Sequence, residues 1–254
     1  MGFLRGMGKF LGSIIFTTLL VVAVLLMEIV DFTSYDNFKS LAGGIFEKQL
    51  FSAISEQELE DLHSALLFQC SQTDRVSVPI FGGQPIVLKC GDIRNSDTSQ
   101  LPTLITTSLV ESLYYKDFDC SFVDCITSGN PQNLLVVASD EGNRFYKSLQ
   151  VYAWAGTGLG LILLLVSIGT WAGRLKGIGF NLAFTGVPFL FLGYLQSSLI
   201  PTLPPEIESS VKPVVDSLTS SLRDKFIIVL VVGIVLLVAG YGLGLYLSRK
   251  GGKK

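Results

Sequence analysis

Four long apolar segments constrain this chain more than any other feature of its sequence. Each has about the length that an α-helix needs to cross a hydrocarbon layer roughly 30 Å thick. A buried protein core can absorb one such segment, but not four of them in a chain of 254 residues. The sequence therefore predicts four transmembrane helices, at residues 10–30, 149–172, 178–200 and 226–247.

Basic residues indicate which ends of the predicted helices lie in the cytoplasm. The tail 1–9, the loop 173–177 and the tail 248–254 contain no Asp or Glu but carry Arg5, Lys9, Arg174, Lys176, Arg249, Lys250, Lys253 and Lys254. Lys and Arg accumulate in short cytoplasmic segments of membrane proteins. We therefore predict that both tails and this loop are cytoplasmic. Residues 31–148 and the amphipathic segment 201–225 are then extracytoplasmic.

The first span, residues 10–30, is expected to be an uncleaved signal anchor. Its apolar run is longer than the roughly 7–15 residues of a signal-peptide core, and no small-residue cleavage site follows it. Glu28 is the only ionisable residue in any predicted span, and we expect it at the membrane interface beside Asp31. Because spans two to four contain none, the sequence argues against a pump, an ion-coupled transporter or a voltage sensor.

Residues 31–148 form a predicted acidic domain that contains every cysteine of the chain. Sixteen acidic and eight basic side chains give this segment a net charge of −8, which argues against a nucleic-acid partner because phosphate binding needs a basic face. An even number of cysteines on the oxidising side of a membrane indicates two disulfides. Three pairings are open, and we favour the sequential one, in which Cys70 pairs with Cys90 and Cys120 pairs with Cys125.

Local patterns in the first half of this domain predict helices and one small sheet. Residues 32–45 have helical spacing and are expected to continue the first span, with a weak point at Gly43-Gly44. Ser55-Glu56-Gln57-Glu58 is a capping box that predicts the start of another helix. Alternating apolar residues over 76–88, with Gly82-Gly83 at the turn, are typical of a β-hairpin.

The second half of the domain is predicted to be mainly helical. A helix is expected to begin at Pro102, and Leu134–Val137 is interpreted as a short buried strand. Ser139 has the side chain of a helix N-cap. The helix that it begins is expected to run without a break into the second span.

Regularly spaced glycines predict close packing between the spans. Small residues four apart let helix backbones approach each other in lipid. We assign this role to Gly156, Gly160, Gly169, Gly173, Gly177, Gly186, Gly193, Gly240 and Gly244. Packing within one bundle is the first interpretation, and contacts between the protomers of a homo-oligomer are the alternative. Pro188 is expected to kink the third span.

The sequence contains no nucleophile elbow, no P-loop, no dinucleotide-binding glycine motif and no zinc-protease motif. His63 is the sole histidine and is expected on the polar side of its helix. Asp117, Asp119 and Asp124 are interpreted as a solvated acidic surface and not as a calcium site. We therefore expect no enzymatic activity, no cofactor and no bound metal.

These patterns together predict a membrane protein with an all-α four-helix transmembrane bundle. Its extracytoplasmic domain, between the first and second spans, is mixed α/β, mainly helical and stapled by disulfides. We place the protein in the plasma membrane. The leading hypothesis is a non-enzymatic protein that serves recognition, scaffolding or assembly in the cell envelope, with the lipid bilayer and an extracytoplasmic protein as partners.

Two other functions stay open from the sequence. The first is a subunit of an oligomeric channel or pore. The second is a membrane thiol oxidoreductase, although the chain has no Cys-x-x-Cys spacing of the kind found in redox-active dithiols.

Overall fold

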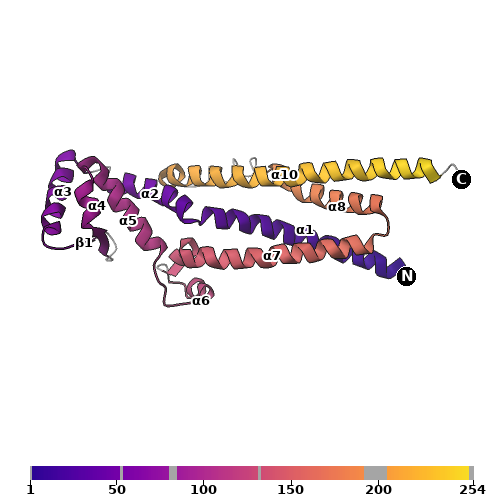
Figure 1. Ribbon diagram of the computed structural model, residues 1–254, viewed down its shortest axis with the longest axis horizontal. Coiled ribbons are helices and arrows are strands. Elements are labelled where there is room, and N and C mark those ends of the chain that lie inside the picture. Colours follow the sequence, from indigo (N-terminus) through magenta and orange to yellow (C-terminus); the bar gives the residue numbers. More distant parts are fainter. Residues whose placement is uncertain (1, 52–53, 80–84, 131–132, 192–204, 252–254) are drawn as a thin grey trace. The chain divides into compact units, whose positions relative to one another are not determined.

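The computed structural model describes residues 2–51, 54–79, 85–130, 133–191 and 205–251. Most of them are helical (Figure 1). The chain separates into two compact units. Met1–Val30 and Tyr146–Lys254 form the first, which we call the helical unit, and Asp31–Phe145 form the second, which we call the disulfide domain.

Four long or medium helices contribute to the described part of the helical unit, and their bounds are α1 (Gly2–Phe32), α7 (Asp140–Ser167), α8 (Trp171–Gly186) and α10 (Pro205–Gly251). Within the described residues, three stretches are long and apolar enough to cross a membrane, namely Gly6–Phe32, Asp140–Ser167 and Val215–Lys250. Their length and composition indicate a membrane protein. α7 runs from Asp140 without a break, as the sequence predicted for the second span.

The third predicted span, residues 178–200, is only partly described. α8 ends at Gly186 and continues as the 3₁₀-helix η3 (Val187–Phe191), while the last part of the span, with Gly193, lies outside the described residues. Pro188 lies in η3. The change in helix type next to it is expected, because proline has no N–H to continue the α-helical hydrogen bonds. The fourth membrane crossing therefore stays a prediction.

The turn between α7 and α8 lies at residues 168–170, not at 173–177 as the sequence suggested. Thr170 is the N-cap of α8, and its hydroxyl oxygen accepts a hydrogen bond from the N–H of Gly173. Arg174 donates from Nε to the carbonyl of Ile168 at 2.9 Å. Residues 173–177, the predicted loop, are therefore helical. The helix begins earlier than expected because Thr170 caps it within the apolar run that was assigned to the second span.

α1 and α7 touch through their backbones at glycine. A Cβ at Gly160 of α7 would lie 2.7 Å from the backbone nitrogen of Phe16, and a Cβ at Gly12 of α1 would lie 2.9 Å from that of Leu164. Non-bonded heavy atoms attract best at about 3.5–4.0 Å, so neither position has room for a side chain. Gly12 was not among the glycines selected from the sequence.

α8 and α10 approach each other in the same way and lie side by side (Figure 1). A Cβ at Gly179 of α8 would lie 2.6 Å from the nitrogen of Leu237, and a Cβ at Gly233 of α10 would lie 2.5 Å from the nitrogen of Ala183. Gly233 was also not among the glycines selected from the sequence. Close backbone approach at small residues is how helices associate in lipid.

The other selected glycines differ in their surroundings. Gly156 lies against the side chain of Leu19, Gly177 against Ile168, Gly186 against Leu230, and Gly240 and Gly244 against Lys176. Gly173 lies beside the Thr170 cap, whereas a Cβ at Gly169 would meet nothing within 4 Å. Most of the glycines selected by their spacing thus contact a neighbouring side chain or helix. The spacing alone does not show which of them, such as Gly169, lie at open positions.

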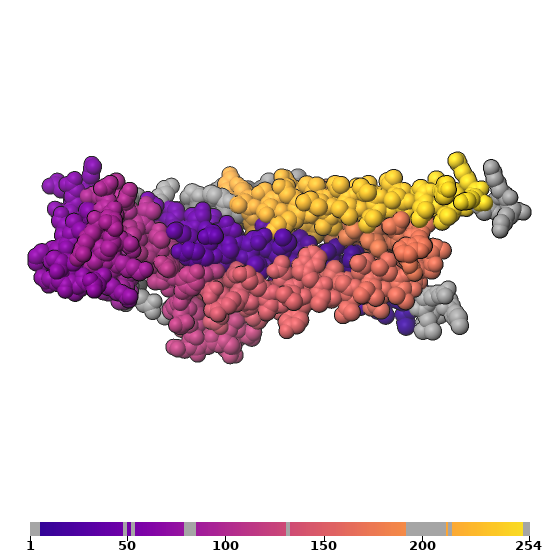
Figure 2. Space-filling view, viewed as in Figure 1, coloured from indigo at the N-terminus to yellow at the C-terminus, as the bar shows by residue number. Residues whose placement is uncertain are grey.

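An apolar cluster joins the helices of this unit. Phe16, Leu20 and Val24 of α1 are buried against Phe226 of α10, whose ring stacks on Phe189 with centroids 3.4 Å apart. Leu161 of α7 and Leu182 of α8 also pack against the cluster. In Figure 2 the indigo surface of α1 lies between that of α10 in yellow and that of α7 in salmon.

Glu28, which we expect from the sequence at the membrane interface beside Asp31, is buried inside this unit. Its side chain is 8% exposed, and Oε2 lies 2.6 Å from Nζ of Lys225 on α10. A buried charge needs a partner of opposite sign. The pair therefore ties the last turns of α1 to α10 across nearly the whole length of the sequence.

The larger part of the disulfide domain consists of α2 (Tyr35–Phe51), α3 (Glu56–Cys70), a β-hairpin and α5 (Leu101–Tyr114). The hairpin strands β1 (Arg75–Pro79) and β2 (Pro85–Lys89) are antiparallel. Capping box, hairpin and the helix with Pro102 in its first turn are all as predicted. The predicted turn at Gly82-Gly83 lies outside the described residues.

The core of this part surrounds the first disulfide. α4 (Cys90–Asn95) follows β2 directly, and Cys70 and Cys90 are joined with their Cα atoms 5.3 Å apart. Apolar side chains pack around this pair, with Leu66, Val76, Ile86, Leu88, Ile93, Leu101 and Ile105 all buried. The disulfide therefore holds the end of α3 to the end of the hairpin within one core.

Two local predictions for the domain were wrong. Residues 32–45 do not continue the first span as one helix, because α1 ends at Phe32 and α2 begins at Tyr35. Ser34 and Asn37 donate side-chain hydrogen bonds to the carbonyl of Asp31, and such bonds compete with helix continuation. Residues 134–137 belong to the 3₁₀-helix η2 (Asn133–Ala138) and do not form a strand.

Two glycines of α10 test the backbone contacts. Gly233→Ala places a Cβ 2.5 Å from the nitrogen of Ala183, whereas Gly242→Ala meets nothing within 4 Å. We expect the Gly233 variant to lose about 1–3 kcal/mol. The Gly242 variant should be unchanged or gain up to about 1 kcal/mol from helix propensity. Thermal unfolding in detergent measures both, and equal effects of the two substitutions would contradict the packing described.

Candidate functional site

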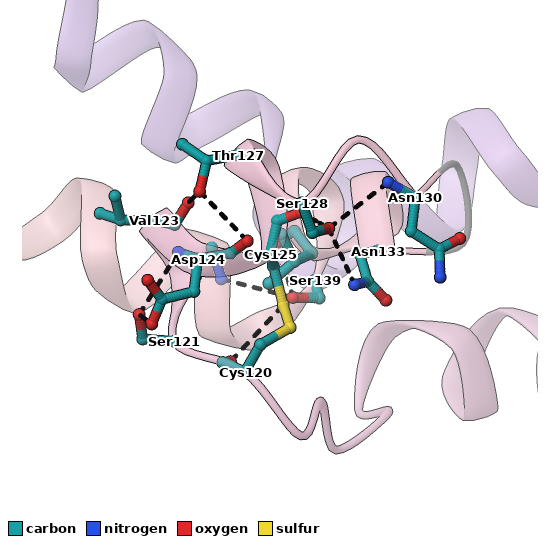
Figure 3. Close-up of a disulfide and its surroundings, with 12 residues drawn as sticks. Cys120, Ser121, Val123, Asp124, Cys125, Thr127, Ser128, Asn130, Asn133 and Ser139 are labelled. Atoms are coloured by element: carbon teal, nitrogen blue, oxygen red, sulfur yellow. Dashed lines mark hydrogen bonds between the residues drawn. A yellow bond between two sulfur atoms is a disulfide. The ribbon is translucent and has the colours of Figure 1, made fainter.

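The second disulfide closes a short loop in the segment between α5 and α7 of the disulfide domain. Cys120 and Cys125 are bonded, with their Cα atoms 5.4 Å apart. Cys125 lies within the short helix α6 (Phe122–Thr127). Both disulfides are therefore those favoured from the sequence. Ser121 caps α6, since its hydroxyl accepts from the N–H of Asp124 and donates to the carboxylate of Asp124 at 2.6 Å (Figure 3).

Side-chain hydrogen bonds fix the chain after α6. Ser128 donates to the carbonyl of Cys125 at 2.7 Å and accepts from Nδ2 of Asn133 at 3.1 Å (Figure 3). Gly129 has a φ of 68°, the left-handed conformation that commonly ends a helix and favours glycine. The segment is therefore held by its own bonds.

One face of this segment is buried. Cys125 of α6 and Val136 of η2 are fully buried, and α6 packs against η2. Phe122 stacks on Phe145 of α7, with ring centroids 4.2 Å apart and an angle of 21° between the planes. These contacts attach α6 and η2 to the first turns of α7 within the disulfide domain.

Six apolar side chains between residues 115 and 137 are exposed. We call them the apolar set: Tyr115, Val123, Ile126, Leu134, Leu135 and Val137. Val123 is 55% exposed and Leu134 is 50% exposed. Exposed apolar side chains that gather on a surface mark binding sites more often than chance. These six lie within 23 residues of sequence, and Val123 lies inside the loop that the second disulfide closes.

A cavity of about 680 Å³ lies next to the apolar set and shares Tyr115 with it. Its aromatic lining is completed by Phe122 and Phe145, and its charged lining consists of Lys116, Asp117, Asp140, Glu141 and Arg144. Arg144 and Asp140 form an ion pair at 2.6 Å. Apolar and charged groups of both signs together suit an amphipathic polypeptide surface better than a small anion.

A buried network of polar side chains lies next to the residues that line this cavity. Tyr114 donates from its hydroxyl to the carbonyl of Thr33 at 3.0 Å, and Asn143 donates from Nδ2 to the hydroxyl of Thr33 at 2.9 Å. All three residues are buried. Burial raises the pKa of Tyr114 to about 12, and the Asp140 carboxylate adds to the effect. The network joins the residue after α1 to α5 and to α7.

The remaining residues singled out from the sequence have structural surroundings. His63 is half-buried, with Nε2 3.3 Å from the carbonyl of Ile93 and Nδ1 3.3 Å from the hydroxyl of Thr98. Asp117 lines the cavity. Among the described residues, no three His, Cys, Asp or Glu side chains are grouped so that they could hold a metal ion.

Sequence reasoning found the cysteines of this site but not its cavity. Tyr115 precedes the second disulfide in sequence, Phe122 lies between its two cysteines and Phe145 follows it. These aromatic residues were the available signal. Arg144 lies one helical turn after Asp140, a spacing that allows an ion pair. Their convergence depends on how α6 packs against α7, which no local pattern shows.

Tyr114 gives this region a testable pH dependence. The raised pKa favours the protonated phenol in the folded state, so its contribution to stability is fully present below pH 10.0 and is lost as the pH rises toward about 12. Tyr114→Phe should weaken this loss and, at neutral pH, should cost about 1–3 kcal/mol because the buried hydrogen bond from the Tyr114 hydroxyl to the Thr33 carbonyl is removed. Unfolding monitored against pH measures both, and an unchanged pH dependence in the variant would contradict the assignment.

No protein-family model, no curated protein and no solved structure matches this chain.

Proposed function

We propose that this chain is a non-enzymatic membrane protein whose disulfide domain recognises a partner protein on the extracytoplasmic side. The observation that carries the proposal is the exposed apolar set near the second disulfide and beside a cavity of mixed charge. Such a surface loses little conformational entropy on binding because its backbone is already fixed.

The proposed side of the membrane follows from cysteine chemistry and from charge. Two closed disulfides are typical of an oxidising compartment outside the cytoplasm. The three segments predicted to be cytoplasmic carry basic residues and no acids. Both arguments support a cytoplasmic basic end and an extracytoplasmic disulfide domain, and the plasma membrane is the compartment that we propose.

The chemistry of the partner follows from the surface that it would cover. The apolar set requires apolar side chains opposite it. The net charge of −8 over residues 31–148 favours a basic rim on the partner, because complementary charge speeds association and excludes wrong partners. We therefore infer a protein surface with an apolar centre and Lys or Arg at its edge.

The structure offers less support for an oligomeric pore. The closest glycine contacts, at Gly12, Gly160, Gly179 and Gly233, are made between helices of the same chain. These glycines are therefore engaged within one bundle. A thiol oxidoreductase would need an accessible dithiol, whereas all four cysteines are paired and Cys125 is fully buried.

A photo-crosslinking amino acid at Val123 tests the proposal. The matched control is Val87 of β2, which is 54% exposed against 55% for Val123 but belongs to the hairpin. In native membranes we expect a discrete protein adduct at Val123 and little or none at Val87. Competition by added salt should weaken the Val123 adduct, since the proposed rim is electrostatic.

Three results would speak against recognition of a separate protein. Equal crosslinking at Val123 and Val87 would show that the apolar set has no special role. Adducts formed only with lipid would place this face against the bilayer. Adducts formed only with a second copy of the chain would favour the oligomeric alternative.

A further inference from the structure

A second cavity lies in the helical unit, at the end that carries Lys9, Arg174 and Lys176. It has a volume of about 370 Å³ and is lined by side chains from all four helices of the unit. Lys9 and Ser13 come from α1, Lys176 and Asn181 from α8, Leu164 from α7, and Tyr241 from α10. It is separate from the cavity of the disulfide domain in every lining residue.

The charge of this cavity is purely positive. Lys9 and Lys176 are its charged lining residues, and no acidic side chain lines it among the residues described. The sequence contains no Asp or Glu from 1 to 27 or from 149 to 205. An anion that enters the cavity therefore meets two cations and no repelling carboxylate.

Lys176 is held in place by glycines whose role the spacing alone did not explain. A Cβ at Gly240 would lie 2.9 Å from Cγ of Lys176, and a Cβ at Gly244 would lie 3.4 Å from its Nζ. The ammonium group lies 4.0 Å from the centroid of the Tyr241 ring, within the range of a cation–π contact. The lysine stem thus lies along a groove in α10 that only glycine leaves open.

A polar bond between helices fixes the inner wall of the cavity. Ser13 donates from its hydroxyl to Oδ1 of Asn181, and Nδ2 of Asn181 donates to the carbonyl of Gly177 at 2.7 Å. Asn181 is only 6% exposed. Since Lys9 precedes Ser13 by one helical turn, it lies on the same face of α1.

The rest of the lining is apolar and opens to the outside of the bundle. Leu164 and Ile168 are buried, whereas Phe180 is 63% exposed and Tyr241 is 59% exposed. A free phosphate or other small anion would use the cations and leave these walls without a partner. A molecule with an anionic head and a hydrocarbon chain would contact both.

We propose that this cavity binds an anionic phospholipid. The phosphate lies between the ammonium groups of Lys9 and Lys176, and an acyl chain extends along the exposed ring of Phe180. Basic pockets between transmembrane helices at the cytoplasmic face suit such headgroups. This inference does not depend on what the disulfide domain recognises.

Binding can be measured on the full chain purified in detergent, by native mass spectrometry with added lipid. The probes are phosphatidylglycerol, zwitterionic phosphatidylcholine and inorganic phosphate. The test variant is Lys9→Gln with Lys176→Gln. Its control is Arg249→Gln with Lys250→Gln, which removes the same charge from exposed positions on α10.

Wild type and control should retain phosphatidylglycerol in preference to phosphatidylcholine. The Lys9/Lys176 variant should bind phosphatidylglycerol about tenfold more weakly or worse, with phosphatidylcholine unaffected. Lys9→Gln alone should show part of the loss, and it leaves the Lys176 contact with Tyr241 intact, so it covers the case in which the double variant does not fold.

Two outcomes would overturn the proposal. Equal losses in the test and control variants would show only a diffuse response to charge. Binding of inorganic phosphate that fully displaces the lipid, with no preference for phosphatidylglycerol, would assign the cavity to a free anion.

Discussion

Backbone contact at glycine is the constraint on which the helical unit depends. Lipid chains are as apolar as leucine, so burial of apolar side chains alone does not hold helices together in a bilayer. Gly12 and Gly160 bring α1 against α7, and Gly179 and Gly233 bring α8 against α10. The Phe16 cluster and the Glu28–Lys225 pair add contacts between α1 and α10.

The same close packing creates the positions where chemistry is available. Gly240 and Gly244 leave the groove in which Lys176 lies, and Ser13 reaches Asn181 because α1 approaches α8. In the disulfide domain a covalent bond takes the place of close packing, since Cys120–Cys125 fixes α6 while its outer face stays exposed. We therefore assign lipid contact to the basic end of the helical unit and protein recognition to the disulfide domain, as separate proposals that rest on separate residues.

Local signals in the sequence predicted the elements that local forces determine. Hydropathy located the apolar helices, and the capping box of Ser55 and Glu58 predicted the start of α3. Alternating apolar residues over 76–88 predicted the hairpin. The turn at 168–170 was missed because Thr170 interrupts an apolar stretch too briefly to change its average. The Leu134–Val137 strand was wrong because a short apolar run fits a 3₁₀-helix equally well. Long-range features such as Glu28–Lys225, Tyr114–Thr33 and both cavities depend on tertiary packing that no window of sequence contains.

Labelling of single introduced cysteines with a membrane-impermeant maleimide tests the central claim most directly, because both proposals require opposite sides of a membrane. The native cysteines are closed in disulfides and should not react. Ser112 of α5 and Ser248 of α10 are both exposed in the structure, so Ser112→Cys and Ser248→Cys are matched reporters. Our account predicts labelling of the Ser112 variant in intact cells and of the Ser248 variant only after permeabilisation. Labelling of both variants in intact cells, or the reverse order, would contradict it.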